Sequence, residues 1–168
     1  MTERDGYYRS YWTPWSDSRS TQDHPAQEWR RTKKESCMTV QIERIAAKSV
    51  FDPPTYTQTM KVTGAQTILF ISGQVDYDER GQPGHPGDFS AQARATFRAL
   101  KAQVEAAGGT LENIVKLTTY LVDIRHRNDL VPVREEFFGK KAPASTLVGV
   151  TALALPGWLI EVEAIAVV

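Results

Sequence analysis

The 168-residue chain has a single cysteine, Cys37, and lacks long apolar runs. One cysteine cannot form an internal disulfide, and its presence is compatible with a reducing cytoplasm. No stretch approaches the roughly 18 apolar residues that a membrane-spanning helix needs. The first residues, MTERDGYYRSYW, also lack the hydrophobic segment of a secretory signal. We therefore expect a cytoplasmic protein without a membrane partner.

The chain also lacks an excess of charge of either sign and any clustering of its histidines. Twenty basic and twenty acidic side chains cancel, so no global field directs the protein toward nucleic acid. His24, His85 and His126 have no partner ligand at the spacing of a metal site. We expect no nucleic-acid partner, no metal and no other cofactor.

The composition changes near residue 38. Residues 1–37 contain three of the four tryptophans and the basic run RRTKK, but no sustained apolar periodicity. Such a segment is too poor in aliphatic residues to build a core, so we expect an N-terminal extension that is flexible or non-native. Its aromatic residues leave open a second interpretation, in which they dock onto a partner. Residues 38–168 are predicted to form the folded domain.

Within that domain the residue patterns predict alternating strands and helices. Asp88 is a good N-cap for a helix over 89–109, which the glycines at 108 and 109 should end. A second helix is expected over 127–139, capped by Asn128 or Asp129, with Pro132 in its first turn. Strands are predicted at 40–45, on both sides of residues 64–65, and at 114–124, 145–154 and 158–168. This order indicates an α+β fold with two helices on one face of a mixed sheet.

The last predicted strand carries two carboxylates on its second face. Residues two apart in a strand point the same way, so Glu161 and Glu163 lie opposite Ile160 and Val162. Carboxylates on an otherwise apolar strand favour a subunit interface or a cleft over open solvent.

The stretch APASTLVGVTALALP, residues 142–156, contains no charged side chain. Its polar side chains are the hydroxyls of Ser145, Thr146 and Thr151. A nucleophilic serine needs a neighbouring base, and the stretch contains no histidine. We therefore do not expect nucleophilic catalysis there.

Several segments resemble the Rid (YjgF/UK114) family of reactive-intermediate deaminases. They are PTYTQTMKVTG, LFISGQV, AQARATFRALKAQVEAAGGTLENIVKLTTYLVDI, PASTLVGV and LIEVEAIAVV, and the resemblance spans residues 40–168. It implies a chorismate-mutase-like fold in which three chains form a trimeric barrel. The sheets of such a homotrimer face inward, and each intersubunit cleft takes a small-molecule ligand.

The resemblance also implies a chemistry. Characterised members hydrolyse enamines or imines derived from amino acids, releasing ammonia and a 2-keto acid. That reaction needs a cation for the substrate carboxylate, a positioned water and a proton for the nitrogen. In deaminating members the cation is an arginine directly after PA, where this chain has Ser145.

At the remaining matched positions, some residues agree with the family pattern and others differ from it. Glu161 matches the glutamate that orients water and is the candidate catalytic residue. Where many members have asparagine and cysteine, this chain has Val131 and Leu147. Nearby arginines offer a replacement for the lost cation, namely Arg125, Arg127 or Arg134. The candidate binding residues are Tyr56, Ser72, Gly73, Val131, Ser145, Thr146 and Leu147.

Three functions remain open from the sequence. The first is hydrolysis of enamines or imines on a substrate that needs no arginine clamp. The second is a non-catalytic trimer that binds a metabolite in its clefts. The third is an interaction or holdase-like role that uses the aromatic residues of 1–37.

Overall fold

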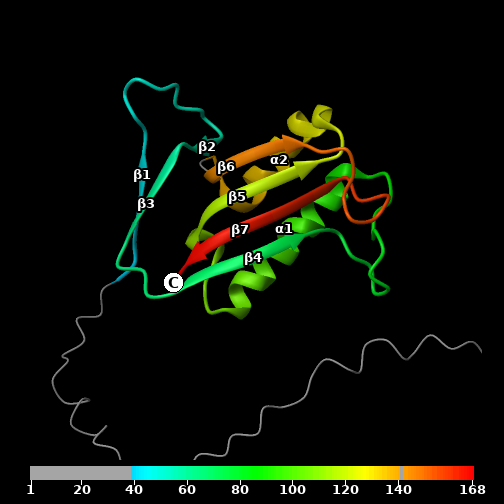
Figure 1. The fold of residues 1–168 in the computed structure, drawn as a ribbon, viewed down its shortest axis with the longest axis horizontal. Helices are drawn as coiled ribbons and strands as arrows, with labels where there is room; N and C mark the ends of the chain where they lie inside the picture. The colour runs from blue at the N-terminus through cyan, green and yellow to red at the C-terminus, as the bar shows by residue number, and fades with distance from the viewer. Residues whose placement is uncertain (1–38, 141) are drawn as a thin grey trace, which may run out of the picture. The chain divides into compact units, whose positions relative to one another are not determined.

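The computed structural model describes residues 39–140 and 142–168, which belong to one compact unit. The predicted boundary between 1–37 and 38–168 lies outside the described residues and stays a prediction, as does any role of the extension. Along the chain the elements are β1 (Gln41–Ile45), β2 (Tyr56–Thr57), β3 (Thr59–Thr63), β4 (Ile68–Gln74), α1 (Phe89–Ala106), η1 (Leu111–Asn113), β5 (Ile114–Leu121), η2 (Ile124–His126), α2 (Arg127–Phe138), β6 (Ala142–Gly149) and β7 (Ile160–Val167), where η marks a short 3-10 helix (Figure 1).

Five strands form the main sheet in the order β2-β6-β5-β7-β4. Strand β5 runs parallel to β6 and antiparallel to β7, and β7 pairs antiparallel with β4. Strands β1 and β3 pair with each other in a separate two-stranded sheet. The predicted α+β fold with a mixed sheet is confirmed. The two-residue β2 was not predicted, because so short a strand has no detectable periodicity.

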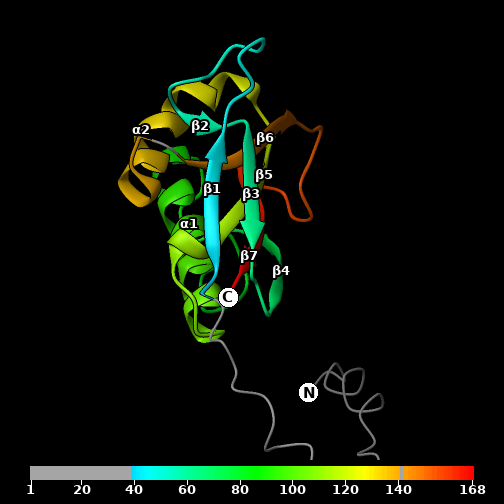
Figure 2. The same cartoon turned by 90° about the vertical axis from the view of Figure 1, so that its left-hand side faces the viewer.

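Both helices pack on the same face of the main sheet (Figures 1 and 2). The core between helices and sheet is apolar and includes the buried side chains of Phe97, Leu100, Leu117, Ile160 and Val162. Burying such side chains contributes roughly 1.5–3 kcal/mol each relative to leaving them exposed. This packing fixes which residues of each strand point toward the helices.

The second face of the sheet is open in the single chain. In β7 the residues Glu161, Glu163 and Ile165 alternate with buried ones, as the sequence predicted. In β4 the side chain of Phe70 is 79% exposed and that of Ile68 is 58% exposed. Two large apolar side chains on one exposed sheet face indicate a surface that another element covers.

The predicted caps of α1 are confirmed. The Asp88 side chain accepts a hydrogen bond from the Ala91 backbone N–H at 2.9 Å. Past the other end, Gly108 has a φ of 83°, a left-handed conformation that glycine adopts without a steric penalty.

The predicted cap of α2, Asn128 or Asp129, was wrong, although the helix was predicted to start at the right residue. The helix begins at Arg127, and its N-cap is His126, which makes no capping hydrogen bond with its side chain. Pro132 therefore lies inside the helix and not in its first turn. The proline is tolerated because it lies on the exposed side, where the carbonyl of Asn128, which it leaves unpaired, is free to meet water.

The observed bounds of β5, β6 and β7 differ from the predicted ranges 114–124, 145–154 and 158–168. Strand β5 ends at Leu121, whose partner in β6 is Gly149, so both strands stop at the same pair. The chain past Gly149 no longer has a partner strand, and the alternation of the sequence alone could not show this. Strand β7 begins at Ile160, which pairs with Leu121 at the end of β5. Trp158, just before it, donates its indole N–H to the Asp76 carbonyl at 2.9 Å.

Candidate functional site

A cavity of about 310 Å³ lies between the helix face of β6, helix α2 and the chain around β2. Its lining includes four of the predicted binding residues, Tyr56, Val131, Ser145 and Leu147. The remaining lining residues are Thr55, Ile124, Arg127, Leu130 and Arg134. The volume is at the lower end of the range for small-molecule sites, so the cavity suits a small metabolite.

The local structure explains why these residues meet. Ser145 and Leu147 of β6 lie beside the buried Leu117 and Thr119 of β5, so both point toward the helices. On α2 the residues 127, 131 and 134 are spaced by four and three, which places them on one face of the helix. Strand β2 brings Tyr56 to the cavity by pairing with β6.

The lining of this cavity is cationic. It includes two arginines, Arg127 and Arg134, and no acidic residue. Arg134 is only 8% exposed. Burial lowers the pKa of Arg134 below its ordinary value, while Tyr56 and Glu135 act in the opposite direction. An arginine stays protonated at neutral pH even so, because its ordinary pKa exceeds about 12.

Arg125, the third arginine considered as a replacement, does not line this cavity. Its guanidinium pairs with the Asp123 carboxylate, and the Arg125 side chain is 88% exposed. Hydrogen bonds from the side chain and backbone of Arg125 lower the pKa of Asp123 to about 2. Arg125 therefore stabilises the short helix η2 and does not contribute to the cavity.

A second group of predicted residues lies on the open face of the sheet, where β4 meets β7. The pairing of these strands is irregular between Ile71 and Gln74, which is where Ser72 and Gly73 occur. The Glu161 carboxylate lies against Gly73, so that a Cβ on Gly73 would come within 1.8 Å of Glu161 Oε1. The glycine therefore makes room for the carboxylate.

Other polar side chains on the open face are already engaged. The Lys116 ammonium donates to the Thr146 hydroxyl and to the Leu117 carbonyl, and burial lowers the pKa of Lys116. The Tyr120 hydroxyl donates to the Glu163 carboxylate at 3.2 Å. In the described part of the chain, Glu161 makes no such bond. Thr146 was predicted together with Ser145, but it points to the opposite face and does not line the cavity.

The predicted site residues thus form two groups on opposite faces of one sheet. The cavity residues face α2, whereas Glu161 pairs with Tyr120 on the open face. Strand β5 lies between β6 and β7 in the sheet, and β4 lies farther still from β6. One chain therefore does not bring Glu161 to the Ser145 cavity. The sequence predicted these residues as candidates, but it could not show that they lie on opposite faces of the sheet.

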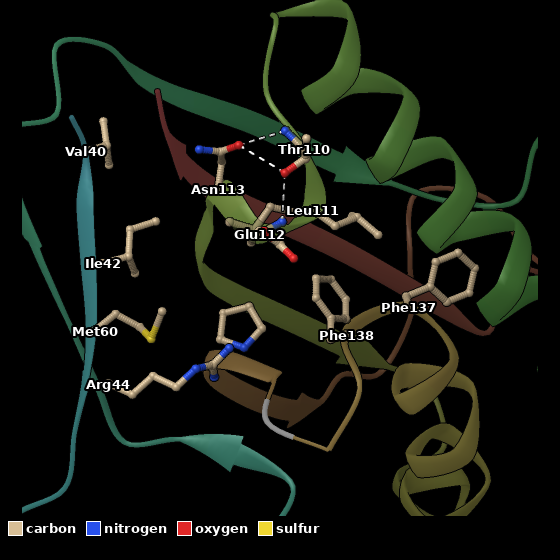
Figure 3. Close-up of a pocket in the computed structure, with 12 residues that line it drawn as sticks. Val40, Ile42, Arg44, Met60, Thr110, Leu111, Glu112, Asn113, Phe137 and Phe138 are labelled. Atoms are coloured by element: carbon tan, nitrogen blue, oxygen red, sulfur yellow. Dashed lines mark hydrogen bonds between the residues drawn. The ribbon is translucent and has the colours of Figure 1, made fainter. Parts of the chain in front are cut away.

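A larger cavity of about 550 Å³ lies between the β1–β3 sheet, η1 and the end of α2 (Figure 3). Its polar groups mostly serve the fold. Arg44 donates to the Thr57 hydroxyl at 2.7 Å and to the Ala142 carbonyl at 3.2 Å. Thr110 and Asn113 cap η1, and Asn113 also donates to the Val167 carbonyl. This cavity offers fewer free groups for chemistry than the one beside α2.

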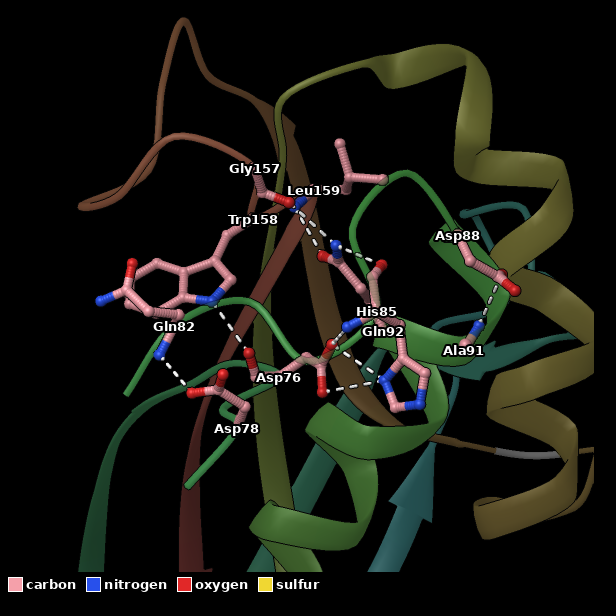
Figure 4. Close-up of polar contacts among 10 residues, drawn as sticks. All are labelled: Asp76, Asp78, Gln82, His85, Asp88, Ala91, Gln92, Gly157, Trp158 and Leu159. Carbon is pink, nitrogen blue, oxygen red and sulfur yellow. Dashed lines mark hydrogen bonds and ion pairs between the residues drawn. The ribbon is translucent and has the colours of Figure 1, made fainter. Parts of the chain in front are cut away.

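Sequence reasoning missed a buried polar cluster at the start of α1. Asp76 is 2% exposed and accepts hydrogen bonds from the backbone N–H of His85 and from its ring Nδ1 (Figure 4). Gln92 is fully buried and connects the helix to the chain just before β7. No local signal marks these residues, because their partners lie far away in the sequence.

Within residues 39–140 and 142–168, no group of three or more histidine, cysteine, aspartate or glutamate residues lies close enough together to hold a metal ion. No helix in that part of the chain is long and apolar enough to cross a membrane.

Comparison with known proteins gives consistent matches. The sequence model of the family described as Endoribonuclease L-PSP matches residues 52–168. A RutC family protein of Pyrococcus horikoshii is 38% identical over 111 residues, covering 66% of this chain and 85% of the relative. Protein MMF1, a mitochondrial protein of Saccharomyces cerevisiae, is 33% identical over 112 residues, covering 67% of this chain and 74% of the relative.

Solved structures agree with these relatives. A crystal structure of the Rid family protein YyfB from Yersinia pestis superposes with a TM-score of 0.68 at 27% identity. The match covers 76% of this chain and 98% of that protein. The chain therefore belongs to the Endoribonuclease L-PSP family, also known as the YjgF/Rid family.

Proposed function

We propose that this protein binds a small metabolite in a cleft between two copies of a homotrimer and hydrolyses its enamine or imine group. The observation that carries the proposal is the Glu161 carboxylate, which lies against Gly73 and has no hydrogen-bond partner among the described side chains. A carboxylate whose oxygens have no hydrogen-bond partner is available to orient a water molecule.

Two observations support the assembly of each cleft from two chains. The Ser145 cavity and Glu161 lie on opposite faces of the sheet, so a second copy is needed to bring them together. The open face also exposes Phe70 and Ile68, which a neighbouring chain would cover. A closed ring of three chains would repeat one contact and produce three equal clefts.

In the proposed reaction Glu161 orients a water and accepts its proton as the oxygen attacks the C=N carbon. The nitrogen takes up protons, the C–N bond breaks, and a carbonyl product and ammonia leave. The overall change is the addition of one water to an imine to give a ketone or aldehyde and ammonia. The Tyr56 hydroxyl is placed on the cavity side as a hydrogen-bond donor.

A non-catalytic role is the second candidate, and the cavity lining favours it. Val131 and Leu147 contribute apolar surface, and Ser145 contributes a neutral hydroxyl. Arg127 and Arg134 add positive charge, and the lining contains no carboxylate that could accept a proton. Such a lining can bind a metabolite without performing chemistry. The family description mentions an endoribonuclease. RNA binding depends on an excess of positive charge, and the basic and acidic side chains of this chain cancel, so we do not propose RNA cleavage. For the compartment we propose the cytoplasm.

The test is ammonia release from a panel of freshly generated amino-acid imines, with and without an α-carboxylate. Release above the uncatalysed rate supports hydrolysis. No release from any imine, together with thermal stabilisation by the corresponding keto acid, would replace the hydrolase by the binding protein.

Gly73→Ala provides a sharper check of the Glu161 geometry. The added Cβ would lie 1.8 Å from Glu161 Oε1, so the flexible carboxylate has to move while the backbone need not. We expect ammonia release to fall at least about 10-fold and stability to change by less than about 1 kcal/mol. Unchanged turnover in this variant would rule out the observed position of Glu161 as the working one.

A further inference from the structure

The two glutamates of β7 differ in their hydrogen bonds, although they lie on the same face of the strand. Glu163 accepts a hydrogen bond from the Tyr120 hydroxyl at 3.2 Å. Among the described residues, no group donates to Glu161. The partner of Tyr120 therefore decides which of the two carboxylates stays free.

The register of β5 and β7 would favour the other partner. Tyr120 lies directly opposite Glu161, whereas Thr118 lies directly opposite Glu163. On antiparallel strands, directly opposite side chains have Cβ atoms about 4.5–5.5 Å apart, and diagonal neighbours are about 7–8 Å apart. The Tyr120 hydroxyl nevertheless bonds the diagonal carboxylate of Glu163 and leaves the nearer Glu161 without a bond.

A cation helps to keep Glu163 in this position. Lys116 lies close enough that the charge of Glu163 opposes the lowering of the Lys116 pKa by burial. The Lys116 ammonium also donates to the Thr146 hydroxyl, which connects it to β6. Glu163 thus lies between a hydroxyl and an ammonium that both come from β5, and charge-assisted contacts of this kind hold a carboxylate in place.

We propose that Glu163 is a positioning residue for the hydrolysis, because it holds the Tyr120 hydroxyl away from Glu161. With Glu163 as the acceptor, both oxygens of Glu161 stay available for the water. Without that acceptor the hydroxyl would turn to Glu161, which lies opposite, and a hydrogen-bonded carboxylate is a weaker base. This inference rests on the proposed function and adds to it the residue that keeps the base free.

The Tyr120 hydroxyl is suited to be held and not to act as an acid. Burial raises the pKa of Tyr120, and the charges of Glu163 and Glu161 act in the same direction. Tyr120 therefore keeps its proton around neutral pH and remains a neutral hydrogen-bond donor. Such a donor engages whichever carboxylate is within reach.

Few other charged groups face Glu161. Within strands β4 to β7, the further charged side chain on this face is Lys116, because β4 and β6 contain no charged residue. In the proposed trimer the neighbouring copy adds Arg127 and Arg134 from the Ser145 cavity. These groups are the same in every variant compared below.

The test removes the acceptor and then the donor, with ammonia release as the readout. Glu163→Leu should lower the turnover number about 10-fold, while KM changes much less. Adding Tyr120→Phe to Glu163→Leu should restore turnover to within about threefold of native, because no hydroxyl is left to engage Glu161. A loss in Glu163→Leu that Tyr120→Phe does not restore would overturn the inference.

The pH profile separates the hydrogen bond from the charge. Glu163→Gln lacks the charge as Glu163→Leu does, but it keeps an acceptor for Tyr120. A hydrogen bond favours the ionised form of a carboxylate. The acid limb of the turnover profile should therefore lie at lower pH in Glu163→Leu than in Glu163→Gln. Identical acid limbs in these two variants would contradict the inference.

Tyr120→Phe alone gives a test in which Glu163 is kept. Because Glu161 is already free, turnover should stay close to the native value. A loss of about 10-fold or more would show that the hydroxyl acts on the substrate and would overturn the inference.

These outcomes separate the inference from the proposed function. Native protein that releases no ammonia from any imine would reject the hydrolase and, with it, this role of Glu163. Native release that Glu163→Leu leaves unchanged would reject the role of Glu163 alone.

Discussion

Glu161→Gln is expected to lower the turnover number for ammonia release by about 10²- to 10⁴-fold, the usual contribution of a positioned general base. Glutamine keeps the shape of the side chain and one acceptor oxygen, but it cannot take a proton from water. The Glu161 carboxylate has no hydrogen-bond partner among the described residues, so replacing the carboxylate should leave the fold intact. Substrate affinity should change much less than turnover, because the carboxylate acts on the water.

The matched control is Glu163→Gln. Glu163 lies two residues away on the same face of β7, but its carboxylate already accepts a hydrogen bond from Tyr120 at 3.2 Å. A glutamine there still accepts that bond, so turnover should remain close to the native value. Equal losses in both variants would show that the open face needs negative charge in general, and Glu161 would lose its specific role.

Gln92→Leu is expected to destabilise the protein by about 2–4 kcal/mol. The Gln92 amide donates to the His85 and Gly157 carbonyls, and its oxygen accepts from the Leu159 backbone N–H at 2.8 Å (Figure 4). Leucine fills a similar volume but leaves all three backbone groups without this partner. Those groups connect α1 to the loop before it and to the chain just before β7.

The measurement is the denaturant midpoint at fixed protein concentration, because association would otherwise shift the apparent stability. Gln103→Leu on the exposed side of α1 is the control and should change stability by less than about 0.5 kcal/mol. A Gln92→Leu variant as stable as the control would show that water replaces the lost hydrogen bonds.

Local sequence patterns predicted the helix-sheet framework because they depend on near neighbours. The Asp88 cap, the glycine after α1 and the alternation of β7 are each set within a few residues. The N-cap of α2 could not be predicted in this way. The helix follows directly on η2, whose own N-cap is Asp123, and the side chain of the α2 N-cap, His126, makes no capping hydrogen bond.

The roles of the candidate site residues remain predictions, and the sequence did not indicate how these residues are arranged. Matching to the family pattern identified Tyr56, Ser145 and Glu161, but strand pairing decides which sheet face each one occupies. Thr146 shows the limit, because one step along β6 moves it to the opposite face. Of the three candidate arginines, Arg127 and Arg134 line the cavity, whereas Arg125 pairs with Asp123 outside it, and the sequence could not show this difference.

In the proposed trimer, two chains contribute complementary halves of each cleft. Coexpression of Glu161→Gln and Ser145→Trp chains in equal amounts tests it directly. The first variant lacks the carboxylate, the second has a tryptophan that fills the cavity, and neither alone should release ammonia at more than about 1% of the native rate. If the halves come from different chains, about a quarter of the clefts in mixed trimers receive both native halves. Ammonia release should then recover to about a quarter of the native rate. Mixed trimers as inactive as either variant alone would contradict a shared cleft.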